Sequence, residues 1–375
     1  MRKNVYRCFA LILMMSLLTA CANTGRNPNA DSEKESQFLT ESESMSETEE
    51  KEPEPVVSTI TITATGDCAL GALQYHAYSA SFHEYYDAYG ETYFFKNFKE
   101  VFETDDMTLI NLECVFTDAA DRVEKEFSIK GKPSYNGILS SSSIEVVTLG
   151  NNHSSDYGPE SLEDTKKSVE EVGVSYAIND SISYYTTSEG FVIAVVSASV
   201  TGSGNARDQY LLNGVTEARN QGADIVIACP HWGIERENYP NNYQRNLGHA
   251  LIDQGADLVI GNHPHTLQGA EEYKGKMIMY SLGNFSFGAN RNPADKDTVV
   301  YQQTFTFIDG VLQSDITAKV IPARVSGYDG YNNYQPKIAE GDQAKNILNR
   351  LNEYSAAYGD VSFDENGNLL IKTKK

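Results

Sequence analysis

Short apolar segments that end in polar motifs recur along most of this chain, and this pattern constrains its fold more than any other feature. Between several of them, residues 160–172, 211–221 and 243–254 have the apolar spacing of amphipathic helices. Strands that alternate with helices of about 10–15 residues indicate βαβ units with largely parallel pairing. The apolar segments span residues 57–64, 107–112, 144–149, 191–198, 224–229, 256–260 and 277–282.

The pattern changes in the last part of the chain. Residues 301–308 and 312–321 alternate between apolar and polar side chains without an intervening helix, which predicts antiparallel strands. From residue 326 the chain is rich in Tyr, Asn and Gly, and a helix is expected at residues 344–354. We therefore expect an α/β domain at residues 57–325, with antiparallel strands near its end, and a C-terminal extension at residues 326–375.

The N-terminus has the features of an export signal. A positively charged start precedes an apolar run at residues 8–18, which is too short to cross a bilayer as a helix. The run ends in Leu18-Thr19-Ala20-Cys21, which resembles a bacterial lipobox. The resemblance implies cleavage after residues 1–20 and attachment of diacylglycerol to Cys21. An ordinary secretory signal that happens to contain a cysteine is the alternative.

Residues 21–56 are expected to form the lipidated cysteine and a disordered acidic tether. Residues 30–55 contain ten acidic and two basic residues. The segment has too few apolar residues to form a core. These features predict a lipid anchor at the extracellular face of the bacterial cytoplasmic membrane. The formal net charge of the whole chain is -22, which argues against nucleic acid as a partner. An acidic polymer could approach only at a local cationic site, such as a bound metal.

Histidines and carboxylates gather at the ends of the predicted strands. The chain has seven histidines, and four of them follow predicted strands directly. Each alone could be a turn residue, but the carboxyl ends of parallel strands meet at one edge of a sheet. Imidazole binds Zn, Fe, Ni and Mn, and a carboxylate can bridge two cations. We therefore expect a metal site that contains Asp67, Glu113, His153, His231, His263 and His265, either bound to the metal or beside it.

Six motifs together carry a resemblance to a known family. They resemble, in order, the motif series of the CapA family (CapA/PgsA), which is associated with poly-γ-glutamate capsule synthesis. The resemblance covers residues 59–324 and implies a variant of the calcineurin-like metallophosphatase fold, a four-layer α/β/β/α sandwich. The motifs are Gly66-Asp67, Asn111-Leu112-Glu113, Asn151-Asn152-His153, His231-Trp232-Gly233-Ile234-Glu235, Gly261-Asn262-His263-Pro264-His265 and Ser281-Leu282-Gly283-Asn284-Phe285.

The resemblance implies a role for each matching residue. His153 resembles the general acid beside the metals, and Glu113 stands where metallophosphatases place a bridging aspartate. Glu235 and Asn284 match family positions. Our hypothesis is that their side chains contact either the metal ligands or the substrate. Lys130 is a candidate anion-binding cation, or alternatively a solvated loop lysine. The implied ligands of one or two divalent ions, with Mn, Fe or Zn as the plausible identities, are Asp67, Glu113, Asn152, His231, His263 and His265.

Two departures weaken the expectation of phosphatase chemistry. Metallophosphatases carry Asp-x-His in the first motif, whereas this chain has Asp67-Cys68-Ala69, so one metal position loses a ligand. Glu113 is one methylene longer than the aspartate it replaces. Three cysteines remain in the domain, namely Cys68, Cys114 and Cys229. Because three is an odd number, they cannot form a complete disulfide framework. We expect all three cysteines to be small apolar side chains in the buried core. A Cys68–Cys114 disulfide and ligation of the metal by a thiolate are the alternatives.

These observations predict a membrane-anchored protein that acts in the synthesis, export or processing of poly-γ-glutamate or a related capsular polymer. The expected activity is that of a metal-dependent hydrolase of the metallophosphatase type. The expected partners are the anionic polymer, the membrane through the lipid anchor, and membrane-bound polymer-synthase subunits. Two alternatives stay open: a metal-dependent phosphoesterase with an extracellular substrate, and a non-catalytic subunit that binds the polymer during assembly.

Overall fold

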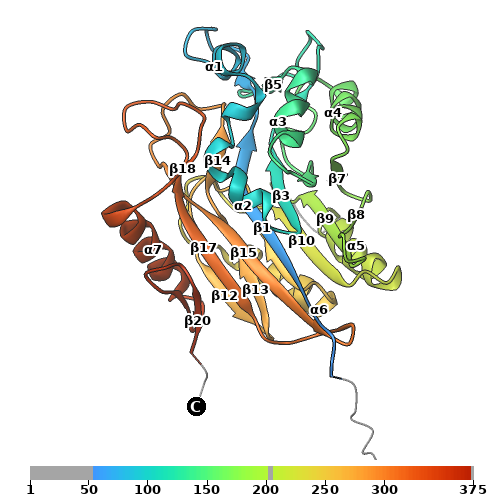
Figure 1. Cartoon of the computed structure of the whole chain (residues 1–375). Coiled ribbons are helices and arrows are strands. Elements are labelled where there is room, and N and C mark those ends of the chain that lie inside the picture. The colour runs from blue at the N-terminus through green and yellow to red at the C-terminus, as the bar shows by residue number, and fades with distance from the viewer. Residues whose placement is uncertain (1–53, 202–205, 373–375) are drawn as a thin grey trace, which may run out of the picture. The chain divides into compact units, whose positions relative to one another are not determined.

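The structure is a computed structural model that describes residues 54–201 and 206–372 (Figure 1). The predicted signal at residues 1–20, Cys21 and nearly all of the predicted tether lie outside the described residues. Among the helices of the described part, none is long and apolar enough to cross a membrane.

One large mixed sheet is built around β1 (Val57–Ala69). β1 is parallel to β3 (Met107–Leu112) and β14 (Asn284–Phe287), and antiparallel to β15 (Asp297–Ile308). As predicted, β15 and β17 (Thr317–Arg324) run antiparallel. The strand order is β18-β17-β15-β1-β3-β6-β7, with β14 beside β1 and β16 beside β15. The remaining strands are β6 (Val146–Thr148), β7 (Ser175–Ala177), β16 (Val311–Leu312) and β18 (Lys337–Ile338).

A second mixed sheet has the strand order β12-β13-β11-β10-β9-β8. Its four inner strands are parallel, and the two edge strands are antiparallel to their neighbours. The parallel strands are β9 (Val192–Ser199), β10 (Ile225–His231), β11 (Leu258–Ile260) and β13 (Lys276–Met279), and the edges are β8 (Ser183–Thr186) and β12 (Ala270–Tyr273).

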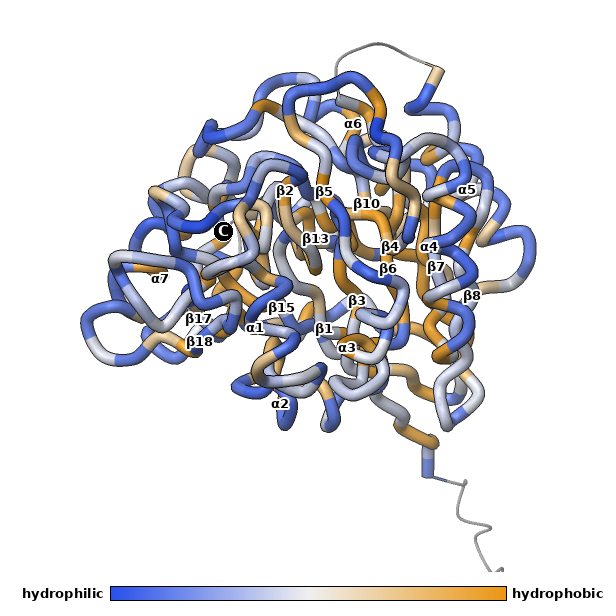
Figure 2. Tube along the Cα trace, turned by 90° about the horizontal axis from the view of Figure 1, so that it is seen from above, coloured by the Kyte–Doolittle hydropathy of each residue, from blue (hydrophilic) through white to orange (hydrophobic). Residues whose placement is uncertain are grey.

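The main apolar core lies between the two sheets. Alternate residues of the strands point into it, including Ile60 and Ile62 of β1 and Ile225 and Ile227 of β10. The hydrophobic parts of the trace accordingly lie inside a more hydrophilic periphery (Figure 2). α7 (Gly341–Ser355) contributes Ile347, Leu348 and Leu351 to this core, so the segment after residue 325 takes part in the same packing.

Helices cover the outer faces of the sheets. α5 (Asp208–Asn220) and α6 (Asn242–Gln254) pack on the face of the second sheet that carries Val196 and Val226. On the first sheet, the face with Ile110 and Leu112 is covered by α1 (Phe82–Tyr89), α2 (Lys99–Glu103), α3 (Asn136–Ser140) and α4 (Pro159–Glu171). The sequence pattern predicted α4, α5, α6 and α7 but not the three shorter helices.

Two small sheets complete the described fold. β2 (Ala72–Leu73), β5 (Ile129–Gly131) and β4 (Val115–Phe116) form a three-stranded sheet that follows the ends of β1 and β3. β19 (Val361–Phe363) and β20 (Leu369–Ile371) form an antiparallel pair after α7. The three-stranded sheet matters for function because its strands and loops surround the cavities described below.

A close backbone approach fixes the end of β1. A Cβ atom on Gly66 would lie 2.1 Å from the carbonyl oxygen of Gly283, a distance that no side chain tolerates. The next residue, Asp67, donates its N–H to the same oxygen at 2.9 Å. The register of β1 against β3 and β14 also shifts at Asp67. Gly66 therefore allows the first motif to lie against the last one.

Candidate metal centre

The polar motifs come together at one end of the two sheets. Asp67 lies near the end of β1 and pairs in register with Asn284 at the start of β14. Glu113 follows β3, and its N–H donates to the carbonyl oxygen of Cys68 at 2.7 Å. His231 ends β10 and forms a bridge to Asn262, directly before His263. The parallel strands thus deliver their C-terminal residues to one location, as is usual in α/β proteins.

Asp67 is held by three neighbours. The Asn111 amide donates to Asp67 Oδ1 at 2.9 Å, and the N–H of His263 donates to Oδ2 at 3.2 Å. His265 Nδ1 also lies 3.2 Å from Oδ2. Asn111 itself is held through its Oδ1 by Thr148 and Asn151. Asn111 belongs to a quoted motif, but nothing in its sequence context indicated that it would orient the carboxylate.

Glu113 lies at the middle of the cluster. Its Oε1 lies 3.5 Å from His231 Nε2, 3.7 Å from His265 Nε2 and 4.0 Å from His153 Nε2. The side chain is completely buried, yet among the described residues Oε1 has no hydrogen-bond partner. A buried carboxylate oxygen without a partner is costly. Its surroundings of imidazole nitrogens fit a bound cation.

The donor atoms form two overlapping sets. One contains Glu113, His263 and His265, and the other contains Asp67, Glu113 and His231. Within each set the donor atoms lie within 4.8 Å of one another. Asn152 Oδ1 adds an amide oxygen 2.7 Å from His231 Nε2. The structure therefore brings together all six residues predicted as ligands, and Glu113 is shared in the way that a bridging carboxylate requires.

Burial and neighbouring charges set the protonation of the imidazoles. Burial, together with neighbouring histidines, lowers the pKa of His231 well below its ordinary value and that of His263 to about 4. Burial also acts to lower the pKa of His265, but the carboxylates of Glu113 and Asp67 outweigh it and raise this pKa to about 10. Burial also raises the pKa of Glu113 well above its ordinary value. His231 and His263 therefore favour the neutral form that binds metal, whereas Glu113 and His265 share a proton that a metal would replace.

His153 lies beside this cluster and has its own support. Its Nδ1 is 2.7 Å from Asp156 Oδ2, which leaves Nε2 on the side of Glu113. Lys125 Nζ forms an ion pair with Asp156 Oδ1 at 2.5 Å and donates to the Asn152 carbonyl at 3.0 Å. Asp156 was not predicted from the sequence, although its place three residues after His153 was an available signal.

The remaining predicted site residues lie at different places. Asn284 Oδ1 is 3.0 Å from His265 Nδ1, and its amide donates to the His265 carbonyl at 3.2 Å, so Asn284 orients His265. Glu235 lines a cavity of about 730 Å³ that opens onto His153 and His265. Lys130 lies on β5 and lines a neighbouring cavity, where its Nζ donates to the Ala119 carbonyl at 2.7 Å.

The three cysteines of the domain are free and buried. The Cys68–Cys114 disulfide is therefore wrong as an alternative in this structure. Both residues belong to the apolar cluster under the helices of the first sheet, whereas Cys229 faces the core between the sheets. Burial raises the pKa of Cys68 to about 12. Among the described residues, neither candidate donor set contains a sulfur, so the cysteines act as apolar fillers.

Fold and site together define a mixed α/β protein with a buried histidine–carboxylate centre suited to a divalent cation. The chain matches the family described as "Bacterial capsule synthesis protein PGA_cap" over residues 61–289, which is more than half of its length. It belongs to this family. The match contains all six residues predicted as ligands, together with His153.

Curated relatives agree with the family assignment. "PGA biosynthesis protein CapA" of Bacillus subtilis (strain 168) is 31% identical over 214 residues, which are 52% of this chain and 56% of the relative. "Capsule biosynthesis protein CapA" of Bacillus anthracis is 30% identical over 229 residues, which are 54% of this chain and 56% of the relative. The chain thus spans little more than half the length of these two relatives.

Two more distant similarities were found. A "Probable polyglutamine synthesis accessory protein" of Mycobacterium tuberculosis (strain ATCC 25618 / H37Rv) is 26% identical over 257 residues, 59% of this chain and 66% of the relative. A solved structure, of a hypothetical protein from Thermus thermophilus, is 15% identical with a TM-score of 0.43 and covers 70% of this chain and 99% of that one.

Proposed function

We propose that this chain acts on poly-γ-glutamate or a related capsular polymer at the cell surface, through a centre of one or two divalent metal ions. The observation that carries the proposal is the buried Oε1 of Glu113, which lies among three imidazoles and has no hydrogen-bond partner in the described part of the chain. The names of the Bacillus relatives, which refer to PGA and capsule biosynthesis, support the polymer as the substrate class.

We propose a different role for each group of residues in the centre. Asp67, Glu113, Asn152, His231, His263 and His265 would hold the metal, whose identity we expect to be Mn, Fe or Zn. When bound, a divalent cation polarises a carbonyl or phosphoryl oxygen. His153, turned toward Glu113 and held by Asp156, would give a proton to the leaving group. We propose that Asn284 fixes the orientation of His265 and that Glu235 contacts the bound substrate.

We also propose that the fold is the metallophosphatase type of four-layer α/β/β/α sandwich. The support is the order of packing, in which a core separates two sheets and helices cover both outer faces. A phosphoesterase is accordingly the second candidate function. The His153–Asp156 contact favours it because such a pair suits protonation of an alkoxide leaving group. Ala69, where metallophosphatases have a histidine ligand, counts against it.

Metal analysis combined with a hydrolysis screen tests the proposed function. The purified full chain should contain Mn, Fe or Zn at about one or two equivalents, and it should cleave γ-linked glutamate oligomers in a chelator-sensitive reaction. Cleavage of a phosphodiester dye alone would favour the phosphoesterase instead. Metal binding without turnover of either substrate would favour a non-catalytic assembly subunit. A chain that binds no metal contradicts all three versions of the metal centre.

We propose that the protein is anchored by lipid at the extracellular face of the cytoplasmic membrane, where membrane-bound polymer-synthase subunits could be partners. The support is the sequence Leu18-Thr19-Ala20-Cys21 behind a short apolar run. Cys21→Ser should release the protein into the medium or leave an unprocessed precursor, because two acyl chains hold far more strongly than none. Fractionation and mass spectrometry of the N-terminus measure this. Normal processing with unchanged membrane retention would contradict the anchor.

A further inference from the structure

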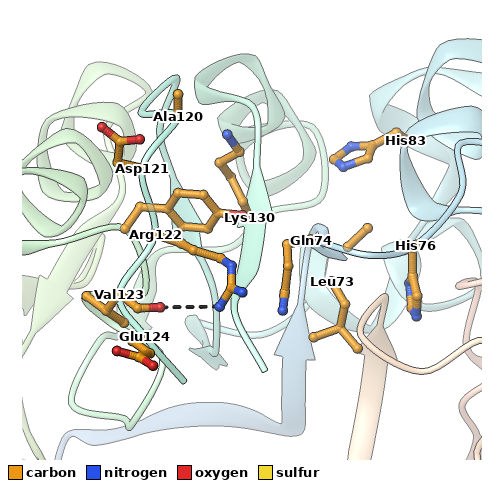
Figure 3. A pocket seen from close by; sticks show the side chains of 12 residues that line it. Leu73, Gln74, His76, His83, Ala120, Asp121, Arg122, Val123, Glu124 and Lys130 are labelled. Carbon is orange, nitrogen blue, oxygen red and sulfur yellow. Dashed lines mark hydrogen bonds between the residues drawn. The ribbon is translucent and has the colours of Figure 1, made fainter. Parts of the chain in front are cut away.

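A second cavity adjoins the one at the metal centre. It has a volume of about 690 Å³, and the two cavities share Leu73 and His76 in their walls. Arg122 and Lys130 reach into the second cavity from the segment between β4 and the end of β5, and His76 and His83 lie across from them (Figure 3). The two cavities are therefore direct neighbours.

The cations of the second cavity have no carboxylate partners among the described residues. Arg122 donates to the carbonyl oxygens of Val123 and Lys125, at 3.4 and 2.9 Å. Lys130 donates to the Ala119 carbonyl and lies 4.6 Å from the ring centroid of Tyr157. Carbonyl contacts position a cation without neutralising it. Both side chains therefore keep a full positive charge for a ligand.

Among the described residues, four arginines form no ion pair; Arg122, Arg236 and Arg291 line the two cavities, and the fourth, Arg207, lies elsewhere and donates to the Ser199 carbonyl. Arg236 and Arg291 line the cavity at the metal centre, and neither forms an ion pair within the described part of the chain. By contrast, four arginines elsewhere pair with carboxylates, namely Arg219, Arg245, Arg324 and Arg350.

We propose that the two cavities form one groove for an extended polymer with regularly spaced carboxylates, in which Arg122 and Lys130 bind carboxylates remote from the reacting unit. This inference rests on the proposed function, since it places the reacting unit at the metal centre. The groove offers separate cationic contacts to a polyanion, because Arg122 and Lys130 have no carboxylate partner among the described residues, although acidic residues also line both cavities.

The groove suits carboxylates better than phosphates. Its cations are separate single charges, and each can balance one monovalent carboxylate. Asp121 and Glu124 line the same cavity, and their charge opposes a phosphate polymer with its higher charge density more strongly.

Titration calorimetry of the full chain in detergent, with and without chelator, tests the groove. The probes are a long γ-linked glutamate oligomer, free glutamate and polyphosphate of matched length. The wild type should bind the oligomer more tightly than glutamate. The double variant Arg122→Gln/Lys130→Met should bind the oligomer about tenfold or more weakly, because two charged contacts are lost. Its metal content should stay unchanged, since neither residue belongs to the donor sets.

The control is Lys319→Met/Lys345→Met, which removes the same charge from exposed positions that line neither cavity. It should bind the oligomer like the wild type. A loss in the first variant that persists in chelator supports the groove even if the metal centre fails its own test. Equal affinities of the two double variants, no advantage of the oligomer over glutamate, or preference for polyphosphate would each overturn the proposal.

Discussion

Glu113→Ala is expected to weaken metal binding by more than about 100-fold. Glu113 is the one residue common to both donor sets, so its loss removes a ligand from each candidate position. Even residues that only support metal ligands typically contribute about 10–100-fold to affinity, and a shared ligand should contribute more. Metal content after dialysis against a buffered metal, measured by mass spectrometry, gives the result directly.

A matched control separates ligation from general electrostatics. Glu235 lines the cavity at the metal centre, and its charge acts to raise the pKa values of His263 and His265. It belongs to neither donor set. Glu235→Gln removes the same negative charge and should retain most of the metal. If both variants lose metal equally, the effect of Glu113 is one of charge alone, and its assignment as the shared ligand is wrong.

The Glu113 variant should also report on the state without metal. A buried carboxylate with an unpartnered oxygen destabilises the fold unless a cation or proton compensates it. Without metal, the proton that Glu113 shares with His265 supplies this compensation, so the thermal midpoint of Glu113→Ala in excess chelator should not exceed that of the wild type. With metal present the difference should widen, because only the wild type gains stability from binding.

The sequence indicated that these residues would converge, because they lie at or near strand ends. Asp67 lies near the end of β1, Glu113 follows β3 and His231 ends β10, so the positions of the strands indicated where these residues lie. Parallel pairing of β1 with β3 brings Asp67 and Glu113 together, whereas His231 reaches them from the second sheet. The place of β14 was harder to predict, because this short strand pairs with β1 only where the register shifts at Asp67.

What the sequence could not supply are contacts that depend on loops. Asp156 holds His153, and Lys125 holds Asp156 across a long loop, so no local pattern marks that ion pair. The same holds for Arg122, whose cavity is formed by segments on either side of the small three-stranded sheet. The sequence indicated Lys130 as a candidate anion-binding cation, but its neighbours depend on the pairing of β5 with β2 and β4, which no local pattern predicts.

The second large effect is expected at His153. His153→Ala should reduce the rate of any hydrolysis that the metal-loaded chain performs by roughly 10²–10⁴-fold, the usual contribution of a general acid. Its metal content should stay near that of the wild type, because His153 belongs to neither donor set and Nδ1 is engaged by Asp156. Rates and metal content are measured on the same preparations.

The pH dependence and the leaving group make this role specific. Burial lowers the pKa of His153 despite the opposing effect of Asp156, and a general acid works only while it is protonated. The wild-type rate should therefore fall as pH rises through this pKa, and the fall should be absent in His153→Ala. A substrate whose leaving group departs without a proton should lose little rate in the variant. If such a substrate loses as much as the others, or if metal is lost with the histidine, His153 is a ligand and not the proton donor.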